Sequence, residues 1–103
     1  MGNLHYYSQV FPVEDRTLSH VQVVVGVKLR RHEPFFLSWT SGSAQGSGRH
    51  SLWIDRGVPL HFEYIGNRHP AVNREWIEQL ITAANGPAGV NLADPRNHEP
   101  GTR

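Results

Sequence analysis

The chain has 103 residues, enough for one domain with a single hydrophobic core but too few for a catalytic domain with a separate lid. Hydrophobic residues make up 38% of the sequence and aromatic residues 10%, which is typical of a folded domain rather than of a disordered chain. Ten basic residues stand against nine acidic ones, and a net charge of +1 is too small to argue nucleic-acid binding from bulk charge.

The composition also excludes several kinds of site. Without cysteine, the chain has no disulfide, no thiolate metal site and no cysteine nucleophile. The seven histidines show none of the spacings of a zinc site, so we predict no metal and no other cofactor. No apolar run is long enough to cross a membrane, and the first residues lack the charged and apolar regions of a signal peptide. We therefore expect a cytoplasmic protein without membrane contact.

The first elements in chain order are two short strands at 4–7 and 10–13, which form a tight hairpin around Ser8 and Gln9. Pro12 cannot donate a backbone hydrogen bond, so the second strand is expected at a sheet edge.

The next stretch, 15–31, fits two patterns. Its valines recur with a period of two, which is typical of a strand. At helical spacing, four apolar side chains fall on one stripe: Leu18, Val21, Val25 and Leu29. The end signals favour the helix, because Glu14 and Asp15 stand at its start, basic residues occupy its last turn and Pro34 follows.

The second half of the chain predicts three strands, a helix and a short last strand. The strands span 35–40, 51–55 and 60–65, and the helix runs from an N-cap at Asn73 to a stop at 85–87. Residues 90–92 add a short strand, and 93–103 have the composition of a disordered tail. The order ββαβββα predicts one α+β domain over 1–92, with a mostly antiparallel sheet and both helices on one face.

The glycine- and serine-rich loop 41–48 allows two interpretations. It is a flexible hairpin linker by composition, and its backbone amides could also contact an anion. The glycine spacing does not match that of a phosphate-binding loop, and a strand rather than a helix follows. The linker is the favoured interpretation.

A basic edge is the most specific constellation that the sequence offers. Its predicted members come from the end of the first helix and from three loops: Lys28, Arg30, Arg31, Arg49, Arg56 and Arg68. Trp39, Trp53 and Tyr64 could lie near it as stacking groups. The alternative is that the last-turn basic residues only complement the helix dipole and that the aromatic side chains are core.

Catalysis has weaker support in the sequence. Ser38, His61 and Glu63 could meet across a sheet as a nucleophilic trio, but no G-x-S-x-G motif accompanies them. His20 stands at the border of the apolar stripe and is interpreted as a structural histidine rather than a general base.

Several strings together resemble a known family: Asp15-Arg-Thr-Leu-Ser-His-Val-Gln22, Lys28-Leu-Arg-Arg31, Leu52-Trp-Ile54, Asn73-Arg-Glu-Trp-Ile77 and Ala84-Asn-Gly-Pro-Ala-Gly89. They are similar to a family of small actinobacterial proteins of unknown function, many of which carry the label "ATP-dependent DNA ligase". The resemblance runs from about Leu4 to Leu92. It implies no catalytic residues that can be transferred to this chain.

The ligase label conflicts with the chemistry of this sequence. DNA ligases need a lysine nucleophile in a Lys-x-Asp-Gly setting, whereas the sole lysine, Lys28, is followed by Leu29, Arg30 and Arg31. We therefore expect a non-catalytic binding module that contacts nucleic acid or another phosphate-bearing ligand through its basic edge. The alternative is a protein–protein or homo-oligomerisation module that uses a sheet edge or an aromatic face.

Overall fold

The computed structural model describes residues 1–41, 48–67, 69 and 71–101. Its elements, in chain order, are β1 (Gly2–Tyr6), β2 (Gln9–Val13), α1 (Asp15–Arg30), β3 (Phe35–Ser41), β4 (Gly48–Ile54), β5 (Leu60–Glu63), α2 (Arg74–Ala84), β6 (Val90–Asn91) and the 3-10 helix η1 (Pro95–Asn97). The predicted α+β class is confirmed.

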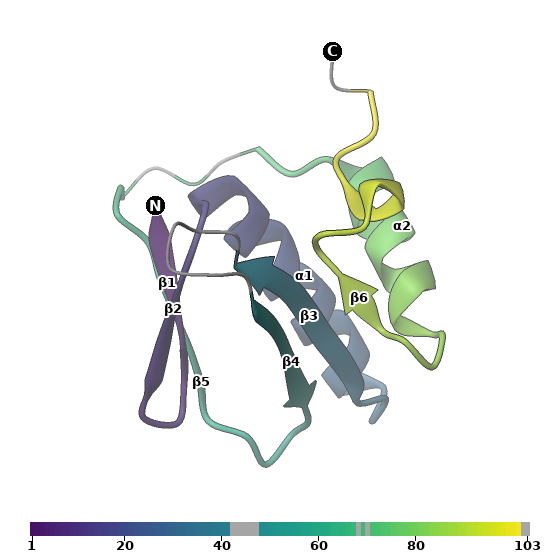
Figure 1. The fold of residues 1–103 in the computed structure, drawn as a ribbon. Helices are drawn as coiled ribbons and strands as arrows, with labels where there is room; N and C mark the ends of the chain where they lie inside the picture. The colour runs from purple at the N-terminus through teal and green to yellow at the C-terminus, as the bar shows by residue number, and fades with distance from the viewer. Residues whose placement is uncertain (42–47, 68, 70, 102–103) are drawn as a thin grey trace.

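The strands form two three-stranded sheets rather than the single sheet that we predicted. The first sheet has the order β2-β1-β5 and the second the order β4-β3-β6, with only the β3–β6 pair parallel (Figure 1). Pro12 lies in the edge strand β2, as expected from its missing N–H. The split falls at the turn between β4 and β5. These strands are consecutive in the chain, but β4 pairs with β3 in the second sheet and β5 pairs with β1 in the first.

The ambiguous stretch is a helix, because helical spacing buries its apolar side chains together. Leu18, Val21, Val24 and Val25 are all buried against both sheets and α2, and this burial outweighs the modest helix propensity of valine. The helix ends in two closing hydrogen bonds, from the N–H of Glu33 to the carbonyl of Lys28 (3.0 Å) and from that of His32 to Leu29 (3.1 Å).

The two helices lie side by side behind the second sheet, and α1 also packs on β1 (Figure 1). The side chains that face this layer form one core: Leu4, Leu18, Val21, Val24, Val25, Phe35, Leu37, Leu52, Ile54, Trp76, Leu80, Ala84 and Val90. The two sheets meet in front of α1, where the ring of Phe11 from β2 packs edge-on against Trp39 from β3, with centroids 5.0 Å apart. None of the described helices has the length and apolar character needed to cross a bilayer.

The segment that we expected to be a disordered tail packs against α2. The indole N–H of Trp76 donates to the carbonyl of Asn97 (2.9 Å), and Asn97 is itself buried. Asp94 begins the 3-10 helix by accepting from the N–H of Arg96 (2.9 Å). A low-hydrophobicity segment can therefore be ordered here because polar groups of the folded domain give its backbone partners.

Candidate nucleic-acid interface

Lys28, one of the predicted edge residues, is buried. Its side chain is only 3% exposed, and its ammonium donates to Glu33 Oε1 (2.8 Å) and to Asn85 Oδ1. These bonds join the end of α1 to the C-cap of α2. The helical periodicity of the sequence indicates this burial, because Lys28 lies four residues after Val24 and three after Val25, on the same buried face of α1. Lys28 therefore fixes the helix pair and presents no charge to a surface ligand.

Three of the predicted basic residues remain together at one end of the molecule. Arg30 and Arg56 line an open hollow of about 580 Å³ whose floor is formed by Val25, Gly26 and Leu29. His32 lies between them, and Arg56 Nη1 contacts its Nδ1 and lies 3.0 Å from its Nε2. Arg31 follows Arg30 in the chain and is exposed. We call Arg30, Arg31, His32 and Arg56 the basic end.

His32 adopts an unusual backbone conformation that gives the basic end its shape. Its φ is 59°, in the left-handed region where glycine normally closes a helix. The closing hydrogen bonds of α1 keep it there, and its ring is directed at the guanidinium of Arg56. The ring therefore lies between the end of α1 and the turn that holds Arg56.

The arginines of the basic end make no direct ion pair with a carboxylate in the described structure, although the charge of Arg31, after the hydrogen bond from Lys28, contributes to the lowered pKa of the Glu33 carboxyl. Within the described ranges, ion pairs with carboxylates occupy Arg16, Lys28 and Arg96, and none involves Arg30, Arg31 or Arg56. The two nearest acids in the chain are engaged elsewhere: Glu33 by Lys28, and Asp55 by the backbone N–H of Arg56 (2.7 Å). The guanidinium groups are therefore available to a ligand.

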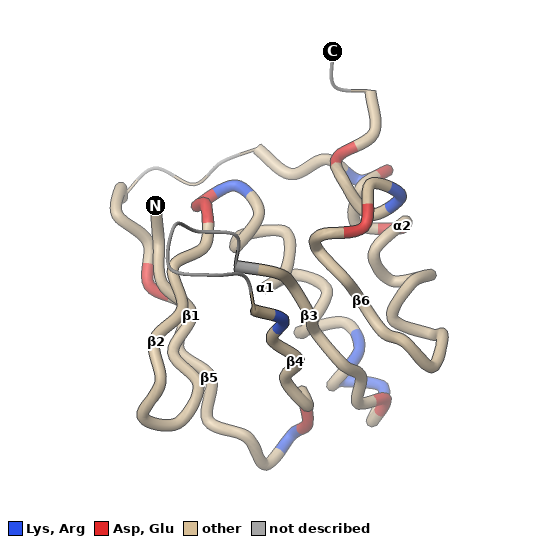
Figure 2. Tube along the Cα trace, viewed as in Figure 1, with Lys and Arg blue, Asp and Glu red and all other residues tan. Residues whose placement is uncertain are grey.

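Of the last two predicted edge residues, Arg49 does not join this group and Arg68 is not among the described residues. Arg49 pairs with Thr40 at the opposite end of the β3–β4 hairpin, roughly 20 Å along β4 from Arg56. Figure 2 shows basic positions at both ends of β4. Arg68 lies outside the described residues, as does most of the glycine- and serine-rich loop (42–47).

An exposed aromatic pair stands beside the basic end. Phe36 and Trp53 are opposite each other on β3 and β4, on the face that points away from α1. They are 41% and 43% exposed, and their rings meet edge to face with centroids 4.9 Å apart. Of the three aromatic residues that we expected near the edge, only Trp53 is here; Trp39 stacks on His50, and Tyr64 is half-buried.

The rest of this outer face is polar. Beyond the aromatic pair, Ser38 and Ser51 face each other and share a hydrogen bond (3.0 Å), and the next pair is Thr40 and Arg49. The face therefore changes along the hairpin from aromatic to hydroxyl-bearing to basic. The strand alternation had predicted that Phe36 and Trp53 lie opposite the core, but their proximity required the register of β3 on β4.

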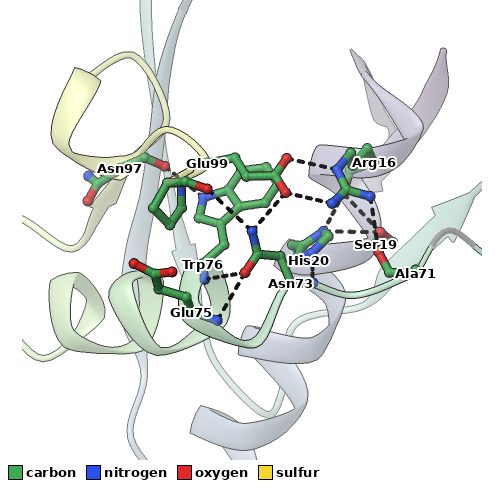
Figure 3. Close-up of polar contacts among 10 residues, drawn as sticks. Arg16, Ser19, His20, Ala71, Asn73, Glu75, Trp76, Asn97 and Glu99 are labelled. Atoms are coloured by element: carbon green, nitrogen blue, oxygen red, sulfur yellow. Dashed lines mark hydrogen bonds and ion pairs between the residues drawn. The ribbon is translucent and has the colours of Figure 1, made fainter. Parts of the chain in front are cut away.

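A second polar cluster, inside the fold, is structural. His20 is fully buried; its Nε2 accepts from the backbone N–H of Asn73 (2.8 Å), and its Nδ1 donates to the carbonyl of Arg16 (2.7 Å). Trp76 packs on the imidazole with ring centroids 4.4 Å apart (Figure 3). Both ring nitrogens have partners within the protein, so His20 holds α1 to the start of α2, in agreement with its interpretation as a structural histidine.

Glu99 closes the same cluster from the C-terminal segment. Its carboxylate accepts from Arg16 Nε (2.8 Å), Arg16 Nη2 (2.5 Å) and Asn73 Nδ2 (2.9 Å) (Figure 3). The hydrogen bonds from Arg16, followed by that from Asn73, lower the pKa of the Glu99 carboxyl to about 2. Asn73 meanwhile caps α2 by accepting from the N–H groups of Glu75 and Trp76.

The weakly supported trio of Ser38, His61 and Glu63 does not assemble. Ser38 lies in the second sheet, whereas His61 and Glu63 lie on β5 in the first. Glu63 instead pairs with His5 (2.8 Å), and the hydrogen bond from His5 is the main reason that the pKa of the Glu63 carboxyl is lowered. Among the described residues, no three histidine or acidic side chains are grouped so that they could hold a metal ion.

Comparison with known proteins gives a family but no activity. Searches of curated proteins and of solved structures returned no match. One family model, described as a domain of unknown function, matches residues 1–95 and so covers every strand, both α-helices and all the described residues of the basic end. The chain belongs to this family of domains of unknown function, DUF7882.

Proposed function

We propose that this chain is a small non-catalytic binding domain that holds a phosphate-bearing ligand at its basic end. The observation that carries the proposal is that Arg30 and Arg56, from distant parts of the chain, line one open hollow without a carboxylate partner. An arginine that is not neutralised by the protein keeps its planar set of donors for phosphate oxygens.

The position at the end of α1 needs a further physical argument, since a helix C-terminus carries partial negative charge and disfavours anions. Two carbonyls of the last turn are satisfied by the N–H groups of His32 and Glu33. Arg30 and Arg31 add two full positive charges at the same place. The sum favours an anion, because full charges outweigh a dipole of about half a charge.

The lining of the hollow supports binding rather than turnover. It contains two aliphatic side chains, one glycine, two arginines and one histidine, and neither a carboxylate nor a hydroxyl. A Cβ at Gly26 would meet no atom within 4 Å, so the glycine borders open space on this side of α1. Glycine is unfavourable in a helix interior by up to about 1 kcal/mol, and room for a ligand is one compensating benefit.

The test is fluorescence polarisation with a labelled abasic deoxyribose-phosphate 12-mer, which offers phosphates without bases, in 50 mM salt. We expect binding by the wild type, and a loss of about tenfold or more in Arg30→Gln/Arg56→Gln. Arg74→Gln is the matched control: Arg74 is also exposed and outside the ion pairs of the described chain, but it begins α2 at the opposite end of the fold (Figure 1).

A second variant tests the hollow without removing an arginine. Gly26→Glu places a carboxylate one helical turn before Arg30, where it pairs with the guanidinium and slightly stabilises the helix. We expect a folded protein that no longer binds the probe. Absence of wild-type binding in 50 mM salt, or equal losses in Arg30→Gln/Arg56→Gln and Arg74→Gln, would overturn the proposal.

A protein–protein or homo-oligomerisation role is the second candidate. The observation in its favour is the exposed pair of Phe36 and Trp53, because aromatic residues are enriched in the centres of interfaces. Light scattering of the wild type and of Trp53→Ser tests self-association: a dimer that the substitution dissociates supports this role, and a monomer at high concentration argues against it.

A further inference from the structure

We infer that the phosphate-bearing ligand is a single-stranded nucleic acid, whose bases stack on Phe36 and Trp53 while its phosphates contact the basic end. This inference rests on the proposed function and adds the chemical class of the ligand. It follows from the placement of an exposed aromatic pair and unpaired arginines at the same end of one hairpin.

The two groups are adjacent along both strands of the hairpin. Arg56 comes three residues after Trp53, in the turn that leaves β4, and His32 comes four residues before Phe36, just ahead of β3. The cross-strand pairing of Phe36 with Trp53 brings the two short connections to one place, where the Arg56 guanidinium contacts the His32 ring. The rings lie on the outer face and the hollow on the α1 side, so a flexible ligand that covers the rings reaches the arginines by passing around this end of the hairpin.

The backbone that carries the aromatic pair is held by contacts on both sides. The hydroxyl of Tyr6 from the first sheet donates to the backbone carbonyl of Trp53 (2.9 Å). On the other side, Gly89, the residue before β6, lies so close to the Phe36 carbonyl that a Cβ would overlap it, so the chain packs directly on β3 at this residue. Because the backbone under both rings is held and the rings pack on each other, they lose less freedom when a base stacks on them, which favours binding.

The small positive charge of the chain favours a single strand over a duplex. A net charge of +1 and three arginines at the basic end can neutralise only a few phosphates, and a duplex would offer the face little besides phosphate and sugar. A single strand also offers flat base surfaces, and each base–aromatic stack contributes from about 5-fold to about 100-fold in affinity.

The remaining outer face can continue to hold a strand but fits a protein partner poorly. The hydroxyl pair Ser38–Ser51 and then Arg49 follow the rings at intervals of about 7 Å along β4, offering hydrogen bonds and one more cation. A stable protein interface buries about 800 Å² on each side around an apolar centre. Among the described residues of this face only Phe36 and Trp53 are apolar, so stacking of bases is the better match.

The experiment compares three labelled probes in 50 mM salt: a thymidine 12-mer, the abasic 12-mer and a 12-base-pair duplex. We expect the thymidine strand to bind at least about tenfold more tightly than either of the others. Trp53→Leu and Phe36→Leu should each weaken thymidine binding, and the double variant Phe36→Leu/Trp53→Leu should reduce it to the abasic level while leaving abasic binding unchanged. Trp53→Phe keeps a ring and should retain most of the affinity.

The outcomes separate this inference from the proposed function. Equal binding of the thymidine and abasic strands, or tighter binding of the duplex, would overturn the inference and leave phosphate binding in place. If neither strand binds, both fail. The comparison among probes uses only the wild-type protein, so it does not depend on the folding of any variant.

Discussion

The ion pair between Arg16 and Glu99 gives the most direct test of how the C-terminal segment is attached. Glu99→Gln keeps the shape of the side chain and removes its charge. The carboxylate accepts hydrogen bonds from three nitrogens, Arg16 Nε, Arg16 Nη2 and Asn73 Nδ2. The amide has only one acceptor oxygen, so it cannot accept all three hydrogen bonds. We therefore expect Glu99→Gln to destabilise the fold.

The pKa of Glu99 sets the size of this effect. A pKa lowered from 4.5 to about 2 corresponds to about 3 kcal/mol if solvent does not screen the pair. The side chains of Arg16 and Glu99 are 40% and 19% exposed, so screening by water reduces that value. We expect a loss of about 1–2 kcal/mol at pH 7, which lowers Tm by roughly 4–8 °C for each kcal/mol in a domain of this size.

The pH dependence has a defined sign. Because the folded-state pKa of Glu99 lies below the unfolded value, the stabilisation is complete above about pH 5 and is lost as the pH falls towards 2. The difference in Tm between wild type and Glu99→Gln should therefore shrink over this range. Thermal unfolding followed by circular dichroism at pH 7, 5, 3.5 and 2 measures it.

The control is Glu78→Gln, which changes an exposed glutamate on α2 whose side chain makes no hydrogen bond or ion pair in the described structure. It should unfold close to the wild type at every pH. Equal Tm values for wild type and Glu99→Gln at pH 7, or a difference that persists unchanged at pH 2, would refute the attachment of the C-terminal segment through this carboxylate.

Three further substitutions test individual contacts. Gly89→Ala should lower the free energy of unfolding, measured in urea, by more than about 2 kcal/mol, because φ is 70° and a Cβ would overlap the Phe36 carbonyl. A smaller loss would show that β6 can move away from β3. Lys28→Met should lower the free energy of unfolding only modestly, by about 1–2 kcal/mol, because Glu33 and Asn85 are exposed enough for water to replace the lost ammonium. Probe binding should stay intact, and weakened binding would show that Lys28 contributes to the site. His32→Gly should raise Tm, because glycine adopts the left-handed φ of this position without the strain of about 1 kcal/mol that a side chain adds. An unchanged or lower Tm would mean that the contact of His32 with Arg56 contributes more than this strain costs.

Local patterns predicted the elements well, because each depends on neighbours in the chain. The stop signals and apolar stripe gave α1, and Asn73 was found as the N-cap of α2 from its place before an apolar helix face. The division into two sheets could not be predicted in this way. It depends on the partner of β5. This strand pairs with β1, which is far from it in the sequence, rather than with β4, which directly precedes it.

The candidate site was predicted in part for the same reason. Arg30, Arg31 and Arg56 were identified by type, but charge alone could not separate an exposed arginine from the buried Lys28 two positions earlier. Phe36 was missed as a partner of Trp53 because the pairing depends on the register of β3 on β4. The C-terminal segment was assigned to disorder by composition, since its order depends on Arg16, Asn73 and Trp76 in distant elements.

The distribution of paired and unpaired charges supports the proposed binding site. Where the fold needs a charge for its own stability, it provides a partner: Glu33 for Lys28, Glu99 for Arg16 and Asp94 for Arg96. At the basic end, by contrast, the described structure pairs none of the three arginines with an acid and places two exposed rings beside them. Unpaired cations and exposed aromatic rings bring little stability to a folded domain, so their occurrence together is better explained by a partner that supplies both phosphate and a flat surface.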